Sequence, residues 1–340
     1  MLDPTLLESW NVSALDYPAN SPQRDRLAFL VRYAILAPSS HNTQPWLFEV
    51  SDDAIALRAD YSRTLRVIDR EGRQLAMSCA AALYNLRLAM RHFGHTDEVE
   101  MLPEPDDLSL IARVRPGVAR APDAETEKLF EAIPHRHTNR QPFEIRPVSE
   151  ALSDALTAAA EAEGAWLARL DPNSKSEAAA LIAAADRIQF QSKDFRRELS
   201  EWLSPGRSHR RDGIPTELKS DQPLGAEPLV VRTFDLGKSV AAKEHELASG
   251  SPMLAVLGSE GDRLPDWLRV GQAMQRILLL ARVHGLSASF LNQVLEVEEL
   301  RPKLRVPGKQ GFPQLILRLG FGPEAPATPR RTLDEVLRLS

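Results

Sequence analysis

Short polar side chains are concentrated in one run of the chain, Ala37-Pro38-Ser39-Ser40-His41-Asn42-Thr43-Gln44-Pro45-Trp46. An apolar helical pattern precedes this run, and Pro38 predicts that the helix ends there. Gln44 precedes a proline, which favours an extended backbone, and residues 46–50 then predict a strand. We expect a rigid polar loop between a helix and a strand, a place where binding residues are often found. An ordinary connecting loop is the alternative.

Cationic side chains surround a hydroxyl group in a second run, His135-Arg136-His137-Thr138-Asn139-Arg140. Two guanidinium groups flanking a hydroxyl suit a phosphomonoester, because charge-assisted hydrogen bonds to phosphate contribute on the order of 1.5–3 kcal/mol each. A solvated basic turn is the alternative. Further basic residues, Arg330 and Arg331, follow a Pro/Gly-rich loop near the C-terminus, where a solvated tail is the alternative.

Other chemistry finds little support in the sequence. Gly237-Lys238-Ser239 lacks the upstream glycine of a P-loop, and the chain contains no Gly-x-Gly-x-x-Gly. The histidines lack nearby cysteines or a His-Glu-x-x-His pattern, so we expect no metal site. Cys79, the single cysteine, lies on an apolar helical stripe and is interpreted as core filling.

The polar run, written Pro-Ser-Ser-x-Asn-x-Gln-Pro-Trp, resembles the flavin-contacting loop of the nitroreductase family of FMN-dependent oxidoreductases. The basic run resembles the Arg-x-Ser-x-Arg start of those proteins, which binds the FMN phosphate, with Thr138 in the place of the usual serine. The resemblance implies that the ring edge is held by Pro38, Ser39, Ser40, Asn42 and Gln44. It implies that the phosphate is held by Arg136, Thr138, Arg140, Arg330 and Arg331.

Residues 285–292 resemble a further nitroreductase loop, whose backbone donates a hydrogen bond to the flavin nitrogen that receives hydride. By position this N–H belongs to Asn292, with Ser289 and Phe290 beside the ring. Gln191 resembles a family amide that reaches the ribityl chain or the ring edge. No side chain is expected to act as a catalytic nucleophile, because the flavin carries the difficult chemistry.

Helices and strands follow one another in a similar order in both halves of the sequence. We predict helices over residues 24–36, 75–90, 152–162, 178–195 and 267–283. We predict strands over residues 46–50, 55–59, 108–114, 165–170, 253–257 and 314–319, with the best linker over 116–126. The similar order suggests an internal duplication.

The polar loop lies in the first half and the phosphate motif in the second, a layout that resembles the Acg group of nitroreductase-like proteins. The resemblance implies an α+β, nitroreductase-like fold in which two related halves form a pseudo-dimer with one FMN site. The expected halves are residues 1–120 and 121–340, the second with a lid-like insertion at about 204–250.

The composition is that of an ordinary globular protein, with 43% hydrophobic and 26% charged residues. A net charge of −5 predicts no general attraction to nucleic acid or acidic membranes, and we expect a cytoplasmic protein, monomeric or homodimeric. The resemblance implies two-electron transfer from NAD(P)H through FMN to nitro, quinone or similar electron-poor small molecules. A non-enzymatic protein that stores FMN beneath a closed lid is the main alternative, and a flavin-free partner-binding protein is another.

Overall fold

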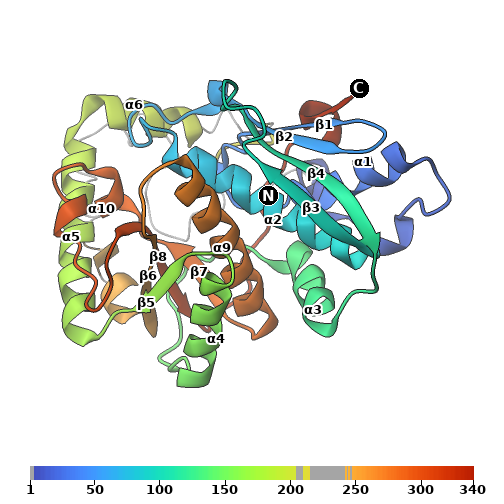
Figure 1. The fold of residues 1–340 in the computed structure, drawn as a ribbon. Helices are drawn as coiled ribbons and strands as arrows, with labels where there is room; N and C mark the ends of the chain where they lie inside the picture. The colour runs from blue at the N-terminus through green and yellow to red at the C-terminus, as the bar shows by residue number, and fades with distance from the viewer. Residues whose placement is uncertain (1–3, 204–209, 215–241, 243, 246) are drawn as a thin grey trace.

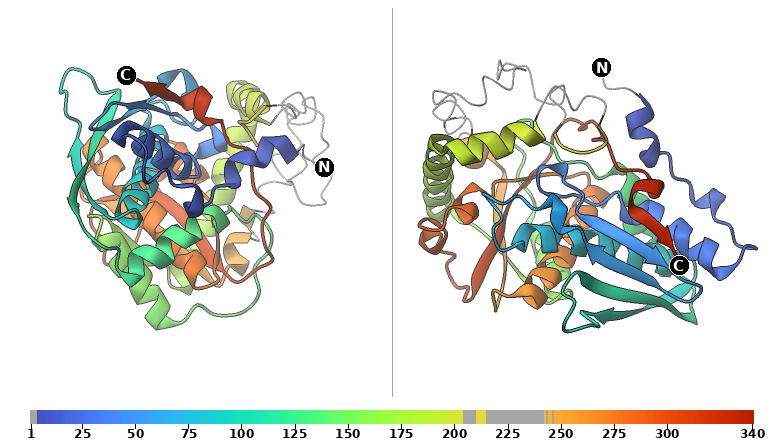
Figure 2. Two further views of the ribbon diagram at one scale, coloured as in Figure 1. Left: turned by 90° about the vertical axis from the view of Figure 1, so that its right-hand side faces the viewer. Right: turned by 90° about the horizontal axis from the view of Figure 1, so that it is seen from above.

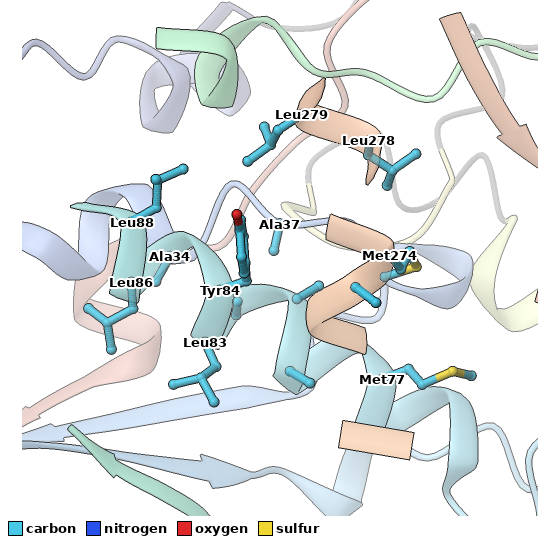
Figure 3. Close-up of a cluster of buried hydrophobic side chains, with 14 of the residues drawn as sticks. Ala34, Ala37, Met77, Leu83, Tyr84, Leu86, Leu88, Met274, Leu278 and Leu279 are labelled. Carbon is cyan, nitrogen blue, oxygen red and sulfur yellow. The ribbon is translucent and has the colours of Figure 1, made fainter. Parts of the chain in front are cut away.

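Two 20-residue helices, α2 (Arg73–His92) and α9 (Leu264–Val283), pack against each other at the centre of the molecule (Figure 1). The computed structural model describes residues 4–203, 210–214, 242, 244–245 and 247–340. The buried cluster of Figure 3 combines leucine, methionine and tyrosine side chains of the two helices with Ala34 and Ala37 from an earlier part of the chain. The helices approach closely at Gly271, where a Cβ atom would lie 2.3 Å from the carbonyl oxygen of Met77.

A five-stranded sheet carries the polar loop and has the strand order β3-β4-β2-β1-β9. Its strands are β1 (Trp46–Val50), β2 (Ile55–Ala59), β3 (His95–Met101), β4 (Leu110–Ala119) and β9 (Leu337–Leu339). The predicted hairpin is confirmed, since Trp46 pairs with Ala59 and Val50 with Ile55. Every second residue of β1 and β2 is buried, the period expected of a strand with one face on the core.

A four-stranded antiparallel sheet lies on the other side of the central helices and has the order β5-β6-β8-β7 (Figure 1). Its strands are β5 (Trp166–Arg169), β6 (Met253–Ser259), β7 (Ser287–Phe290) and β8 (Phe312–Gly320). All seven residues of β6 are buried, which explains why this strand reads as a continuous apolar run.

The remaining helices cover the two sheets. They are α1 (Gln23–Ala34), α3 (Ala124–Ala132), α4 (Glu150–Glu161), α5 (Pro172–Gln191), α6 (Lys193–Trp202), α10 (Gln293–Glu296) and α11 (Leu333–Val336). The helix predicted over 178–195 is in fact two helices, because Ser192 has an extended backbone and its side chain caps the start of α6.

The linker predicted over 116–126 is wrong, because its first part continues β4 and its last part begins α3. Pro116 is tolerated in this strand because β2 pairs with β4 only as far as Val114, and the pairing with β3 shifts register beside Asp97. Asp123 caps α3 by accepting a hydrogen bond from the Thr126 N–H.

The C-terminal segment returns to the first half of the chain, where β9 pairs in parallel with β1 (Figure 2). The segment after β8 therefore crosses from the second sheet to the first. A boundary between related halves at residue 120 stays a prediction, and most of the insertion expected at about 204–250 lies outside the described residues. No helix in the described part of the chain is long and apolar enough to cross a membrane.

Candidate functional site

The polar loop is a strained connection between α1 and β1. Ser40–Asn42 forms a single 3-10 turn, and His41, Asn42 and Gln44 all have positive φ angles, of 49°, 55° and 51°. The extended backbone predicted for Gln44 is therefore wrong. Positive φ is uncommon outside glycine and is found where surrounding contacts enforce it. One such contact is local, because Ser39 Oγ accepts a hydrogen bond from the Gln44 N–H at 2.9 Å.

The C-terminal segment holds this loop in place. Asn42 donates from Nδ2 to the carbonyl oxygen of Pro329 at 3.0 Å and accepts at Oδ1 from Arg330 Nη1, also at 3.0 Å. Gln44 Oε1 accepts from the backbone N–H of Arg331 at 2.7 Å. Residues that the sequence separates by nearly 300 positions are thus neighbours here.

A short described part of the predicted insertion also contacts the loop. The Asn42 side chain donates to the Gly213 carbonyl oxygen at 3.0 Å, and the Gly213 N–H donates back to the Asn42 carbonyl oxygen at 3.2 Å. Gln44 Nε2 donates to the Arg211 carbonyl oxygen at 2.6 Å. Ile214, at the end of this part, lines the cavity described next.

A cavity of about 310 Å³ is lined by the polar loop, the basic run and residues of several helices, among them Met77 of α2 and Met274 of α9. Figure 3 labels these two methionines in the cluster where the central helices meet. The volume of the cavity is at the lower end of the range for small-molecule sites. Both halves of the chain contribute predicted site residues to its lining, which are Pro38, Ser39, Ser40, Asn42, Arg136, Thr138, Arg140, Phe290, Asn292 and Arg330. The polar loop and the basic run therefore share one cavity.

Four predicted site residues do not line the cavity. Gln191 is exposed at the end of α5, and Gln189 lines the cavity instead, because residues two apart on a helix point in different directions. Ser289 points to the opposite face of β7 from Phe290 and accepts from Arg318 Nε at 2.6 Å. Gln44 and Arg331 are buried and brace each other behind the cavity, with Arg331 Nη1 donating to the Gln44 carbonyl oxygen at 3.1 Å.

Two buried guanidinium groups dominate one part of the lining. Arg136 is 4% exposed and Arg330 is 2% exposed, and among the described residues neither forms an ion pair. Within the described residues, Arg136 has a single long hydrogen bond, from Nη2 to the Leu36 carbonyl oxygen at 3.4 Å, whereas Arg330 donates to carbonyl, hydroxyl and amide oxygens of uncharged groups. The Nε atoms of both arginines have no partner among these residues. Burying uncompensated charge is costly, so this pair points to an anionic ligand.

Burial lowers the pKa of Arg136 to about 10, and burial together with the charge of Arg136 lowers the pKa of Arg330. Arg136 still carries its charge at neutral pH. His137 lies beside both arginines, and burial followed by their charges lowers its pKa to about 3, so it stays neutral. The positive charge in this part of the cavity at neutral pH therefore comes from arginine and not from His137.

The sequence analysis missed Arg318, which positions the basic run. Its guanidinium is 1% exposed and donates from Nη2 to the carbonyl oxygens of Asn139 and Gln141, at 3.0 and 2.7 Å. The Asn139 N–H in turn donates to the Ala288 carbonyl oxygen at 2.9 Å, which fixes the run along β7. The available signal was an arginine enclosed by leucines in the predicted strand over residues 314–319.

A second missed set of lining residues carries carboxyl and amide groups. Ser40 Oγ donates to Gln74 Oε1 at 2.5 Å, and Gln74 Nε2 donates to Glu296 Oε1 at 2.8 Å. Gln189 Nε2 donates to the other oxygen of Glu296 at 2.8 Å. This chain of hydrogen bonds joins the polar loop, α2, α10 and α5. Burial raises the pKa of Glu296, and the hydrogen bonds from Gln189 and Gln74 oppose that shift.

Asp186 is the other buried carboxyl group of this set, three residues before Gln189 on the same face of α5. Burial, followed by the charges of Glu244 and Glu296, raises its pKa to about 8. Within the described residues, no group of three or more His, Cys, Asp or Glu side chains could hold a metal ion.

Two mixed helix-and-sheet units thus enclose one cavity lined by unpaired arginines and a strained polar loop, the arrangement of an anion-binding α+β protein. A sequence model described as "Nitroreductase family" matches residues 120–321. The chain belongs to the nitroreductase family.

Relatives that cover nearly the whole chain agree with this assignment. The chain is 32% identical over 325 residues to the Mycobacterium tuberculosis H37Rv protein named "Putative NAD(P)H nitroreductase Rv3131", covering 93% of this chain and 92% of the relative. It is 28% identical over 326 residues to "Putative NAD(P)H nitroreductase acg" of the same organism, covering 93% and 96%. A solved structure of the FMN-dependent nitroreductase NfnB from Mycobacterium smegmatis in complex with NADPH is 16% identical, with a TM-score of 0.40, over 64% of this chain and 98% of that one.

Proposed function

We propose that the protein is an FMN-dependent oxidoreductase that transfers two electrons from NAD(P)H to an electron-poor small molecule such as a quinone or a nitro compound. Two buried arginines that form no ion pair among the described residues, Arg136 and Arg330, carry this proposal, because they leave the cavity with a positive charge that a phosphate would neutralise. The relatives named as NAD(P)H nitroreductases and the NADPH complex of NfnB support the choice of FMN and of a nicotinamide reductant.

The residues present fit FMN. Arg136, Thr138, Arg140 and Arg330 would hold the phosphate, while Arg331 would act from behind by bracing the polar loop. When bound, FMN would accept hydride from the nicotinamide and pass two electrons to the acceptor.

The remaining lining residues would orient the ring and restrict water. Ser39, Ser40 and Asn42 present polar groups, and Phe290 and Asn292 reach the cavity from β7 and the loop after it. Ser40 already donates its proton to Gln74, so its free lone pairs would accept a hydrogen bond from an N–H group of the ligand.

We also propose that the two sheet-and-helix units are related halves that arose by duplication of one ancestral domain, packed through α2 and α9.

FMN storage without turnover is the second candidate function. It is favoured by one observation, that residues 211–214 contact the polar loop and bring Ile214 into the cavity lining. Both functions predict a yellow protein, so colour alone does not separate them.

Anaerobic mixing of the FMN-loaded protein with NADH or NADPH separates the two functions. Bleaching of the flavin absorbance within seconds, followed by its return on addition of menadione, would support the oxidoreductase. Persistence of the oxidised spectrum would support storage. Protein that remains colourless after incubation with FMN and gel filtration would contradict both.

A further inference from the structure

Asp186 is a buried carboxyl group in the cavity lining that has no role in the FMN site proposed above. Asp186 is 2% exposed and lies in the cavity lining, and its Oδ2 atom has no hydrogen-bond partner among the described residues. A buried polar atom left without a partner costs roughly 1–3 kcal/mol, so such an atom in a cavity points to a ligand group that completes its bonding.

The charged groups that face Asp186 come from each element packed around it. Glu296 lies on α10, Glu244 precedes β6, and Arg187 is its exposed neighbour on α5. The Gln293 side chain lies beside it, and the buried Oε1 of Gln293 has no partner within the described part of the chain. Burial and the charges of Glu244 and Glu296 raise the pKa of Asp186 to about 8, and the opposing effects of the Gln293 hydrogen bond and the Arg187 charge are smaller. At neutral pH Asp186 therefore carries a proton that it can donate.

Glu296 cannot take the same role. Its two oxygens accept hydrogen bonds from Gln74 and Gln189, so both are already occupied by donors. Asp186 and Glu296 therefore differ in hydrogen bonding although both line the cavity, and neighbouring carboxyl groups in different environments can take different roles in an active site.

We propose that Asp186 is the proton donor to the electron acceptor, and that the acceptor is a molecule whose reduced form gains a proton on oxygen, such as a quinone. This inference rests on the proposed function. In a quinone reduction, the reductant delivers two electrons and one proton as a hydride equivalent. The O–H bond of Asp186 breaks as an O–H bond forms on the quinone oxygen, giving a hydroquinone, and the carboxylate then regains a proton from water.

The test separates this proposal from the proposed function by bypassing the nicotinamide. The FMN-loaded protein is reduced with dithionite titrated to the end point and is then mixed anaerobically with menadione. We expect D186N to be reoxidised roughly 10²-fold more slowly than the wild type at pH 7, the size of effect typical of a lost general acid. We expect the wild-type rate to fall above about pH 8, as the carboxyl loses its proton.

The matched control is D154N, which removes an exposed carboxyl from α4 and should be reoxidised at the wild-type rate. Asp186→Glu keeps the carboxyl and should restore part of the rate. If D186N does not fold, the fall of the wild-type rate above about pH 8 tests the proposal instead. Equal rates for the wild type and D186N would overturn the proposal, as would a wild type that menadione does not reoxidise. Failure of NADPH alone to reduce the flavin would count against the proposed function only.

A second readout needs no turnover. In infrared spectra, the carbonyl band of a protonated carboxyl group should be present in the wild type and D154N at pH 6, disappear with a midpoint near pH 8, and be missing in D186N. A band that D186N retains, or the absence of such a band in the wild type, would show that Asp186 does not hold a proton at this pH.

Discussion

Arg330 donates a hydrogen bond from Nη1 to Asn42 Oδ1 at 3.0 Å, joining a residue near the C-terminus to the polar loop of the first half. The same amide donates to the carbonyl oxygens of Pro329 and Gly213. Asn42 therefore satisfies three groups on two other segments, and its own positive φ is one that asparagine tolerates better than most residues. The site depends on this junction between distant parts of the sequence.

Replacing Asn42 should weaken both the fold and FMN binding. N42A removes one hydrogen bond each from Arg330, from the Pro329 carbonyl oxygen and from the buried Gly213 carbonyl oxygen, so we expect the free energy of unfolding to fall by about 1–3 kcal/mol. N42G should lose nearly as much, since glycine relieves only the backbone cost of positive φ, about 1 kcal/mol. Urea titration of both variants, with N11A as an exposed control, measures the difference. A full recovery of stability in N42G would assign the role of Asn42 to its backbone.

Arg136 should lower the stability of the FMN-free protein and raise its affinity for FMN. The apolar replacement R136M removes an uncompensated buried charge, so we expect the FMN-free protein to be more stable by on the order of 1 kcal/mol or more. Its affinity for FMN should fall by roughly 10–100-fold, the worth of a charge-assisted phosphate contact. Thermal unfolding with and without FMN measures both, and R120A serves as the exposed control. Equal FMN affinity in R136M and the wild type would remove the phosphate assignment.

The sequence predicted the central elements because their signals are local. Helix α9 and the hairpin β1–β2 follow from apolar periodicity, and the polar loop follows from Pro38 and Pro45. Strand β3 was missed because its sequence, His-Thr-Asp-Glu-Val-Glu-Met, is charged and largely unburied, so it lacks the apolar alternation that marks a strand.

The parts of the site that sequence reasoning missed depend on contacts between segments. Gln74, Glu296 and Gln189 are ordinary polar residues in sequence, and only their hydrogen bonds to one another give them a place in the cavity. Asp186 offered a weak local signal, as a single acid on the buried face of an alanine-rich helix. Which helical face meets the cavity was not predictable within one turn, and this explains the choice of Gln191 over Gln189.

The raised pKa of Asp186 predicts a pH-dependent stability of definite sign. The carboxyl titrates near 4 in the unfolded chain and at about 8 in the folded protein, so between these values the folded state binds more protons. The contribution of Asp186 to the free energy of unfolding therefore falls as pH rises from 4 to 8 and is constant above that range. As pH rises over this interval, the free energy of unfolding of D186N should increase relative to that of the wild type by on the order of a few kcal/mol. Urea unfolding of the FMN-free proteins at pH 5 and pH 8.5 measures the gain, and a difference that does not change with pH would contradict it.

The contact between α2 and α9 should tolerate no added volume at Gly271. A Cβ atom there would meet the Met77 carbonyl oxygen at 2.3 Å and Ala80 Cβ at 2.6 Å, and neither can move without shifting the α2 backbone. We expect G271A to lower the free energy of unfolding by about 1–3 kcal/mol, although alanine is the better helix former. Because Met77 and Met274 line the cavity at this contact, the same change should also weaken FMN binding.

Gly250 is a helical control with nothing within 4 Å of an added Cβ, so G250A should be neutral or slightly stabilising. Urea titration of both variants tests the claim, and similar stability in G271A and G250A would show that the two halves are packed less tightly than these distances require.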